Sequence, residues 1–361
     1  MQPRPVLIMA GGTGGHIYPA LAVADYLRQK GVPLFWLGTA KGLESRVVPQ
    51  NGYQLLTINI SGLRGKGILK WMMAPVILGL ALFQSLLILF KRRPSVVLGM
   101  GGFVSGPGGL AAWLMRVPLY IHEQNAVAGL TNRMLAPMAD IVMEAFPGAF
   151  KALPNVKVTG NPVRPGLFEI ISPEQRLRDR EKNNLRLLVL GGSQGALVLN
   201  RIIPEVIGSV GNDFQIEVWH QSGDRHFEST VTRYQTLCIQ GKIVPFIEDM
   251  TEAYAWADIV ICRAGALTVA ELAAVGVASV LVPYPYAVDD HQTANALYLS
   301  DNDGAILIAE SDLTCDILAR TLSELINSHT KLIEMAKKAR LLAQPLATKT
   351  VAEMCLEAAY A

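Results

Sequence analysis

Short apolar runs alternate along this chain with segments whose apolar residues recur every three to four positions. Residues 5–10 are an uninterrupted apolar run, which is typical of a strand buried in a parallel sheet. A glycine-rich turn follows, and residues 18–31 then show helical spacing that stops at Gly31. Residues 33–40 form the next apolar run. The pattern therefore predicts a strand, a turn, a helix and a second strand, which is a βαβ unit.

The same order of elements recurs further along the chain. Each of four later segments begins with an apolar strand pattern and continues as a helix: residues 95–115, 185–207, 259–276 and 279–300. Strands that alternate with helices predict an α/β fold built on parallel sheets. The restart near Leu185 predicts a second domain that repeats the architecture of the first.

Chain length and turn residues predict where the domains meet. A chain of 361 residues is long enough for two domains of about 150 residues each. Two prolines and two glycines interrupt residues 160–166, so we expect the boundary there. We predict an N-terminal domain over residues 1–163 and a C-terminal domain over residues 164–340. Residues 341–361 are predicted to hold a C-terminal helix that packs back on the N-terminal domain.

Composition and charge exclude several classes of protein. Apolar residues make up 51% of the chain and charged residues 17%, which excludes a disordered chain. The 32 basic and 30 acidic residues nearly balance, whereas a general nucleic-acid binder carries a basic excess. The four cysteines form no CxxC pair, so we expect reduced thiols and no zinc site. The first apolar run is too short for the core of a signal peptide, so we expect no secretion.

One apolar stretch is long enough to concern a membrane. Residues 71–90 contain no charged side chain, and basic residues flank them. The stretch is interrupted by Pro75, Gly79, Gln84 and Ser85. Three interpretations remain open: a helix with one face on the core and the other on the membrane surface, a buried core helix, and a membrane-spanning helix. The basic flanks favour the first interpretation, because anionic lipid attracts lysine and arginine.

The first glycine-rich turn, GGTGGH at residues 11–16, lies between a predicted strand and a predicted helix. Free backbone N–H groups and the positive end of the helix suit a phosphate group there. The turn lacks the lysine of a P-loop, and no acidic residue ends the next strand as a dinucleotide fold requires. A dehydrogenase is therefore disfavoured. The glycines can also serve close packing alone.

His16 ends this turn and falls within the first turn of the predicted helix. Histidine titrates near neutral pH and can take a proton from an attacking hydroxyl group. The helix dipole favours the neutral ring that a base requires. His16 is therefore a candidate general base, with a purely structural role as the alternative. Glu123 and His122 are the next candidates for the base.

Four further polar segments follow predicted strands, where open α/β sheets bind ligands. Residues 122–125, HEQN, are the first, and residues 191–196, GGSQGA, are a second phosphate-type turn. Glu271 can accept both hydroxyl groups of a ribose, or it can simply face a helix dipole. Residues 289–296 form a polar cluster that suits sugar hydroxyl groups. A metal site is not predicted there, because a third ligand group at regular spacing is missing beside the acidic residues and the histidine.

Taken in order, these motifs resemble those of the bacterial MurG family of N-acetylglucosaminyl transferases. The resemblance rests on GGTGGH, ISGLRGKG, VLGMGGFVSGPGG, HEQNAVAGLTN, AFPGAF, GNPVR, GGSQGA, WHQSG, FIEDM, YAWADIVICRAGALTVAEL and HQTANA, which run from residue 11 to residue 296. Each motif alone is weakly specific, whereas the ordered set covers nearly the whole chain. Ala270 departs from the family, where serine is common at this position.

The resemblance implies a GT-B fold, in which two Rossmann-like domains face each other across a cleft. It implies inverting transfer of GlcNAc from UDP-GlcNAc to the 4-hydroxyl of MurNAc in undecaprenyl-pyrophosphoryl-MurNAc-pentapeptide. This step converts lipid I to lipid II in peptidoglycan synthesis, so cell-wall and division proteins are implied partners. The implied location is peripheral, on the cytoplasmic face of the bacterial inner membrane. No metal, cofactor or nucleic acid is expected.

The resemblance also implies roles for individual residues, with His16 as the general base. The implied cleft-facing residues of the first loop are Thr13, Gly14 and Gly15, and Asn125 is implied to contact the donor sugar. Arg164 and Ser193 would hold the diphosphate, Ile247 would meet uracil through its backbone, and Gln292 would contact the GlcNAc hydroxyls. Phosphate and ribose would lie against Ala266, Leu267, Thr268, Val269, Ala270 and Glu271, with Glu271 on the ribose diol.

Two other functions remain open from the sequence. A UDP-GlcNAc 2-epimerase would share the fold, but it would need acidic groups around the donor sugar and no membrane surface. A non-enzymatic, membrane-associated nucleotide-binding protein would not need His16 beside a glycine loop.

Overall fold

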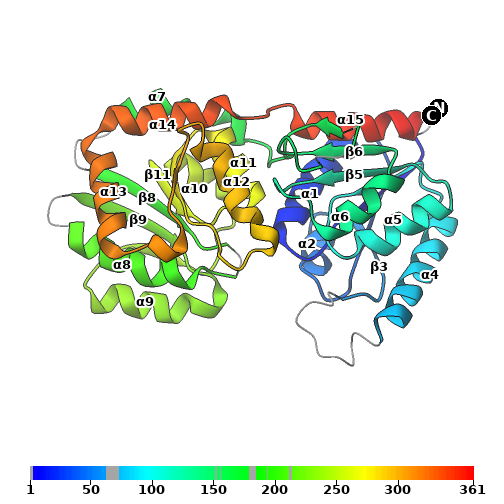
Figure 1. Cartoon of the computed structure of the whole chain (residues 1–361), viewed down its shortest axis with the longest axis horizontal. Helices are drawn as coiled ribbons and strands as arrows, with labels where there is room; N and C mark the ends of the chain where they lie inside the picture. The colour runs from blue at the N-terminus through cyan, green and yellow to red at the C-terminus, as the bar shows by residue number, and fades with distance from the viewer. Residues whose placement is uncertain are drawn as a thin grey trace. The chain divides into compact units, whose positions relative to one another are not determined.

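The computed structural model describes residues 3–61, 73–150, 153–154, 156–178, 184–192, 194–210 and 214–361 (Figure 1). The chain divides into two compact units, one formed by Met1–Arg164 with Leu346–Ala361 and the other by Pro165–Pro345. Each unit is an α/β domain built on one parallel sheet. The fold class predicted from the alternation of strands and helices is therefore confirmed.

The first unit holds a seven-stranded parallel sheet in the order β3-β2-β1-β4-β5-β6-β7. Its strands are β1 (Val6–Met9), β2 (Leu34–Gly38), β3 (Gln54–Thr57), β4 (Val96–Gly99), β5 (Leu119–Glu123), β6 (Ile141–Glu144) and β7 (Val156–Val158). The strand order reverses beside β1, because β2 lies on one side of it and β4 on the other. The loops after β1 and β4 therefore meet at the switch point where open α/β sheets bind ligands.

Helices cover both faces of this sheet. They are α1 (Gly14–Gln29), α2 (Glu44–Gln50), α4 (Ala74–Arg92), α5 (Ser105–Leu114), α6 (Leu130–Leu135) and α15 (Ala347–Tyr360). Val6 and Ile8 of β1 join the core beneath α1 and α15, whereas Leu7 and Met9 join the core beneath α4 and α5. Because alternate residues of β1 serve opposite faces, both faces must be apolar, as its continuous apolar sequence predicts.

The C-terminal helix α15 belongs to the first unit and lies beside α1 (Figure 1). Tyr26 on α1 donates a hydrogen bond from its hydroxyl to Glu353 Oε1 over 3.1 Å. The backbone N–H of Arg4 donates to the carbonyl of Ala359 over 2.9 Å. The chain enters this helix after Pro345, since α15 begins at Ala347.

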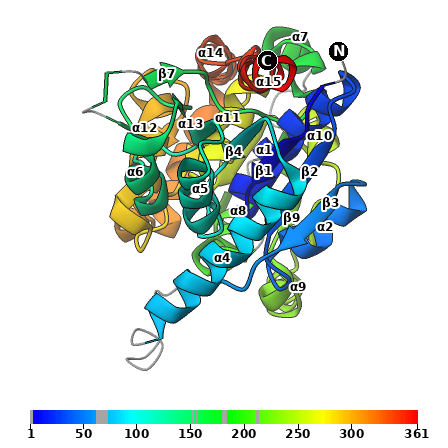
Figure 2. The same ribbon diagram turned by 90° about the vertical axis from the view of Figure 1, so that its right-hand side faces the viewer.

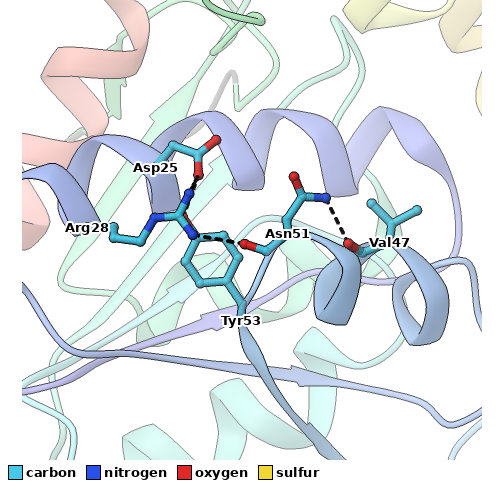
Figure 3. Close-up of polar contacts among 5 residues, drawn as sticks. All are labelled: Asp25, Arg28, Val47, Asn51 and Tyr53. Carbon is cyan, nitrogen blue, oxygen red and sulfur yellow. Dashed lines mark hydrogen bonds and ion pairs between the residues drawn. The ribbon is translucent and has the colours of Figure 1, made fainter. Parts of the chain in front are cut away.

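The end of α1 is tied to the turn between α2 and β3 (Figure 3). Arg28 donates to Asp25 Oδ1 over 2.7 Å and to the carbonyl of Asn51 over 2.8 Å, and its guanidinium lies 4.6 Å from the ring centroid of Tyr53. The Tyr53 hydroxyl donates to Asp25 over 2.6 Å. Burial and this neighbouring carboxylate raise the pKa of Tyr53. These contacts fix the end of α1 against the segment that leads into β3.

The second unit repeats the pattern with a six-stranded parallel sheet in the order β10-β9-β8-β11-β12-β13. Its strands are β8 (Asn184–Leu190), β9 (Gln215–Gln221), β10 (Lys242–Val244), β11 (Ile259–Cys262), β12 (Ala278–Leu281) and β13 (Ile306–Leu307). Its helices are α7 (Pro173–Arg178), α8 (Leu197–Val210), α9 (Phe227–Thr236), α10 (Met250–Trp256), α11 (Ala266–Val275), α12 (His291–Ser300), α13 (Cys315–Asn327) and α14 (His329–Leu341). The order reverses at β8, so the loops after β8 and β11 meet at this unit's switch point.

Figure 2 shows the course of helix α4, whose side chains form two different faces. Ala81, Ser85 and Leu89 are buried and lie four residues apart, so they form one stripe against the core. A second stripe of large apolar side chains is exposed to between 41% and 67%: Val76, Leu80, Phe83, Leu87 and Phe90. By length and composition α4 is the one described helix that could cross a membrane. Its exposed stripe rules out a fully buried core helix. The start of the predicted apolar stretch, Trp71, and the basic residues before it, Lys66 and Lys70, lie outside the described residues.

Candidate active site

The first glycine-rich turn connects β1 to α1. Thr13 precedes the helix in an extended conformation, and α1 begins at Gly14. His16 is the third residue of α1, and its backbone N–H donates to the carbonyl of Thr13 over 3.2 Å. The prediction that His16 lies in the first turn of a helix is therefore confirmed. The backbone N–H groups of Gly14 and Gly15 stand at the positive end of α1, as in helix termini that bind anions.

A buried carboxylate holds this turn from behind. Glu44, the first residue of α2, is fully buried, and its Oε2 accepts a hydrogen bond from the backbone N–H of Gly12 over 3.0 Å. Its Oε1 accepts from the N–H and the hydroxyl of Thr39 over 3.0 and 2.7 Å. The N–H of Gly12 therefore serves the protein itself, which leaves anion binding to the start of α1.

His16 is linked to the loop after β5. Its Nδ1 lies 2.9 Å from Gln124 Oε1, and Gln124 Nε2 lies 3.1 Å from His122 Nδ1. His122 Nε2 lies 2.9 Å from the carbonyl oxygen of Gly160, so it donates a hydrogen bond there. Full burial lowers the pKa of His122 to about 4, and the ring is therefore neutral near pH 7. One network thus joins the helix, this loop and the segment before Arg164.

Glu123 organises the same loop with both of its carboxylate oxygens. Oε1 accepts from the backbone N–H and the side-chain amide of Asn125 over 2.9 and 3.0 Å. Oε2 accepts from the backbone N–H of Gly129 and the amide of Asn132 over 3.0 and 2.9 Å. Four donors thus surround this buried carboxylate, which fits a structural role better than proton transfer.

Two glycines after β4 lie so close to the first turn that no larger residue fits at their positions. A Cβ on Gly101 would lie 2.6 Å from His16 Nδ1, and one on Gly102 would lie 2.3 Å from the carbonyl oxygen of Gly11. Both residues also have φ near +90°, which side chains other than glycine rarely adopt. The glycine-rich turn after β4 therefore packs closely against the first turn and its histidine.

Arg164 lies beside α1 in the first unit. Its guanidinium carbon is 4.5 Å from the ring centroid of Tyr18, which is a cation–π arrangement. Tyr18 packs against Gly14, since a Cβ there would meet the Tyr18 ring at 2.9 Å. The structure therefore places Arg164 close to the helix that begins at the first glycine-rich turn.

In the second unit, α11 begins at Ala266 directly after β11, at the switch point. Glu271 is the sixth residue of this helix and is buried, and the Tyr254 hydroxyl donates to its Oε2 over 3.1 Å. Because the helix dipole acts mainly within the first turn, the simple dipole interpretation of Glu271 loses support. Leu267 and Val269 are buried in the core, so only their backbone groups can face a ligand. Thr268 and Ala270 are half-buried.

Three other predicted contacts also follow strands of the second sheet. Ile247 is buried between β10 and α10. The Gln292 side chain accepts a hydrogen bond through Oε1 from the backbone N–H of Tyr284 over 2.9 Å, which leaves its amide N–H groups as the donors for a ligand. Gly191 and Gly192 follow β8, whereas Ser193 lies outside the described residues.

Local hydrogen bonds connect the turn before α12 to the start of that helix. The Thr293 hydroxyl donates to Asp290 Oδ1, and His291 Nδ1 donates to the carbonyl of Val288, both over 2.7 Å. Over the described part of the chain, no group of three His, Cys, Asp or Glu side chains is placed to hold a metal ion.

The predicted residues fall into two groups, one at the carboxyl edge of each sheet. The first unit holds Thr13, Gly14, Gly15, His16, Asn125 and Arg164, and the second holds Ile247, Ala266–Glu271 and Gln292. Sequence reasoning missed Glu44 and Gln124, which position the first turn and its histidine. Gln124 stood in the polar segment HEQN, but Glu44 carried no signal, because a glutamate at the start of a short helix is usually exposed.

Comparison with known proteins identifies the family. Residues 6–144 match the glycosyltransferase family 28 N-terminal domain, and residues 186–351 match the C-terminal domain of that family. The UDP-N-acetylglucosamine–N-acetylmuramyl-(pentapeptide) pyrophosphoryl-undecaprenol N-acetylglucosamine transferase of Nitrosococcus oceani is 52% identical, with 98% of each chain covered.

Solved structures agree with this assignment. The crystal structure of Acinetobacter baumannii MurG has a TM-score of 0.83 and 40% identity, with 98% of this chain and 100% of that chain covered. A UDP-GlcNAc 2-epimerase from Neisseria meningitidis has a TM-score of 0.68 at 14% identity over 98% of this chain and all of its own, which shows the shared fold alone. The two-domain match, the full-length relative and the MurG structure together show that this chain belongs to the MurG family of family 28 glycosyltransferases.

Proposed function

We propose that this protein transfers GlcNAc from UDP-GlcNAc to the 4-hydroxyl of MurNAc in undecaprenyl-pyrophosphoryl-MurNAc-pentapeptide, with inversion at the anomeric carbon. The observation that carries this proposal is the 52% identity over 98% of the chain to a relative named for that transfer. The test is to incubate the protein with radiolabelled UDP-GlcNAc and a lipid I analogue. Label should enter the lipid product, and UDP-GlcNAc binding without lipid labelling would refute the proposal.

The proposed general base is His16, which takes the proton from the attacking MurNAc hydroxyl. Its ring is half-buried beside the start of α1, at the switch point of the first sheet. The other two candidates for the base, Glu123 and His122, already use their polar atoms in hydrogen bonds within the protein. Four donors surround the Glu123 carboxylate. Burial keeps His122 neutral, and both of its ring nitrogens take part in hydrogen bonds.

Replacing His16 by alanine should lower kcat about 100-fold or more, because a positioned base contributes about 10²–10⁴-fold. The affinity for UDP should change little, since His16 is not among the proposed nucleotide contacts. Stopped-flow or discontinuous transfer assays measure kcat, and calorimetry measures UDP binding. Normal turnover in the folded variant would remove His16 from the reaction.

The second unit is proposed to hold UDP-GlcNAc. The N-terminus of α11 would face the diphosphate, the Glu271 carboxylate would accept both ribose hydroxyls, and the backbone of Ile247 would meet uracil. The Gln292 amide would donate to the GlcNAc hydroxyls. Arg164, Ser193 and Asn125 are proposed as further donor contacts. The positive N-terminus of α11 would offset part of the charge that grows on the departing UDP.

We also propose that α4 rests on the cytoplasmic surface of the bacterial inner membrane, where a lipid-linked acceptor would be found. The exposed stripe Val76, Leu80, Phe83, Leu87 and Phe90 is continuous along the helix. Lys91 and Arg93 at its C-terminal end are exposed and would face anionic headgroups. A helix with one apolar face and flanking basic residues is typical of proteins that bind the membrane interface.

Membrane binding can be tested by replacing Val76, Phe83 and Phe90 with serine. Each large apolar side chain withdrawn from water contributes about 1.5–3 kcal/mol, so binding to vesicles of phosphatidylglycerol should fall at least about tenfold. A matched variant replaces three comparably exposed apolar residues on other elements, Val158, Ile171 and Leu237. This control should bind vesicles normally, and equal binding by both variants would contradict the proposed surface.

A further inference from the structure

The orientation of the Gln124 amide is fixed by a backbone group. Gln124 Nε2 lies 3.3 Å from the carbonyl oxygen of His122 and 3.1 Å from His122 Nδ1. A backbone carbonyl only accepts hydrogen bonds, so the group of Gln124 that faces it must be the NH₂. Exchanging the amide nitrogen and oxygen would set two acceptors against each other. Gln124 Oε1 is therefore the atom that faces His16.

The next link follows from the same reasoning. An amide oxygen is an acceptor only, and it lies 2.9 Å from His16 Nδ1. His16 Nδ1 must therefore carry the hydrogen. In the neutral ring only one nitrogen is protonated, so the lone pair is at Nε2.

We propose that Gln124 is a positioning residue that fixes His16 in the Nδ1–H tautomer, so that Nε2 is the nitrogen that accepts the proton of the acceptor hydroxyl. The inference rests on the proposed role of His16 as base, but the tautomer itself is a property of the free protein. A Ser-His-Asp triad uses an aspartate to set the tautomer of its histidine in this way. Here a neutral amide does so.

The surrounding residues support this role. His122 Nε2 donates to the carbonyl of Gly160, which leaves His122 Nδ1 as the acceptor for the second N–H of Gln124. The low pKa of His122, about 4, keeps it in this neutral form at the pH of the cytoplasm. Gly101 packs directly against His16 Nδ1 and Gln124 Oε1, at 2.6 and 3.3 Å from its would-be Cβ, so there is no room for the ring to turn toward it.

The experiment is nitrogen-15 NMR of the full-length protein, labelled at its six histidines. The chemical shifts of the two ring nitrogens differ strongly between protonated and unprotonated forms. The signals of His16 are assigned by their loss in His16→Ala. Spectra are recorded at about pH 8.5, about two units above the usual histidine pKa.

We expect wild-type His16 to show a protonated Nδ1 and an unprotonated Nε2. Gln124→Met removes the acceptor at nearly constant length, so the Nδ1–H pattern should be lost and kcat should fall about tenfold or more, with KM for UDP-GlcNAc within about twofold. The matched control is Gln29→Met. Gln29 is an exposed glutamine on α1, the helix that carries His16, and its replacement should change neither the NMR pattern nor kcat. The buried ring of His220 reports in the same spectra whether the second unit remains folded. Circular dichroism and thermal unfolding report on the first unit, because Gln124 itself contacts His122.

An Nε2–H pattern for wild-type His16 would overturn the inference, and this spectrum does not depend on any variant. An unchanged Nδ1–H pattern in folded Gln124→Met would overturn it as well. Failure of the base assignment gives a different result, because His16→Ala would then keep its turnover while the wild-type spectrum still showed Nδ1–H.

Discussion

Replacing Glu44 by glutamine should destabilise the first unit without changing the size of the side chain. The fully buried carboxylate accepts three hydrogen bonds, from Gly12 N–H at 3.0 Å, Thr39 N–H at 3.0 Å and the Thr39 hydroxyl at 2.7 Å. A glutamine has only one accepting oxygen. If that oxygen keeps both contacts to Thr39, its NH₂ group faces the N–H of Gly12, and two donors then oppose each other.

The magnitude follows from this count. A buried donor left without an acceptor costs about 1–3 kcal/mol, and the two remaining hydrogen bonds lose the strengthening that a charged acceptor gives. We therefore expect the free energy of unfolding to fall by about 2–4 kcal/mol. For a unit of this size each kcal/mol shifts the melting temperature by roughly 2–4 °C, so Tm should fall by about 4–16 °C.

Calorimetry and urea unfolding followed by circular dichroism measure this change in the first unit. Glu357→Gln is the matched control, because Glu357 is exposed on α15 in the same unit and should change stability by no more than about 0.5 kcal/mol. Equal stability of Glu44→Gln and the wild type would refute the view that this carboxylate holds the turn. Turnover should fall as well, because a shift of Gly12 would displace the turn that carries His16.

Two further predictions concern the second unit and the buried histidines. Glu271→Gln keeps a hydrogen-bond partner for Tyr254 and should weaken UDP binding, measured by calorimetry, about tenfold or more, because a hydrogen bond to a charged group contributes about 1.5–3 kcal/mol. Unchanged affinity for UDP would show that Glu271 does not bind the ribose. Burial lowers the pKa of His122 to about 4 and of His220 to about 3, below the unfolded value of 6.5. The unfolded chain therefore binds more protons below pH 6.5, and stability should be complete above that pH and fall toward pH 4, by up to about 1.4 kcal/mol per pH unit for each ring. Urea unfolding at pH 7 and pH 5 measures this loss, and a slope for His220→Gln as steep as that of the wild type would contradict it.

Much of the fold could be predicted because its signals are local. Apolar runs such as residues 5–10 give the buried strands, and helical spacing gives α1 close to its observed bounds of Gly14–Gln29. The first turn of α1 was predicted with His16 in it, since a glycine-rich turn between a strand and a helix has few other outcomes. Two faces were also proposed for α4, and the structure resolves them into separate stripes.

The supporting residues of the site could not be predicted, because they depend on which loops meet. Gln124 reaches His16 over 108 positions of sequence, since β4 and β5 follow β1 in the sheet order. Glu44 reaches Gly12 because α2 follows β2 on the other side of β1. Neither contact has a periodicity or a motif. The order of strands must be known before either side chain can be assigned a role.

The contacts of Glu44 and Gln124 change the interpretation of the first glycine-rich turn. Its resemblance to a phosphate loop rests on free N–H groups, yet the N–H of Gly12 is bound to Glu44, and the carboxylate places a negative charge directly behind the turn. Gly102 approaches the turn on another side, and Gln124 holds its histidine. Only the N–H groups at the start of α1, beside Arg164, then remain suited to an anion. The glycines therefore serve mainly to let three neighbouring segments pack closely around His16, so the turn fixes the position of the ring that we propose as the general base.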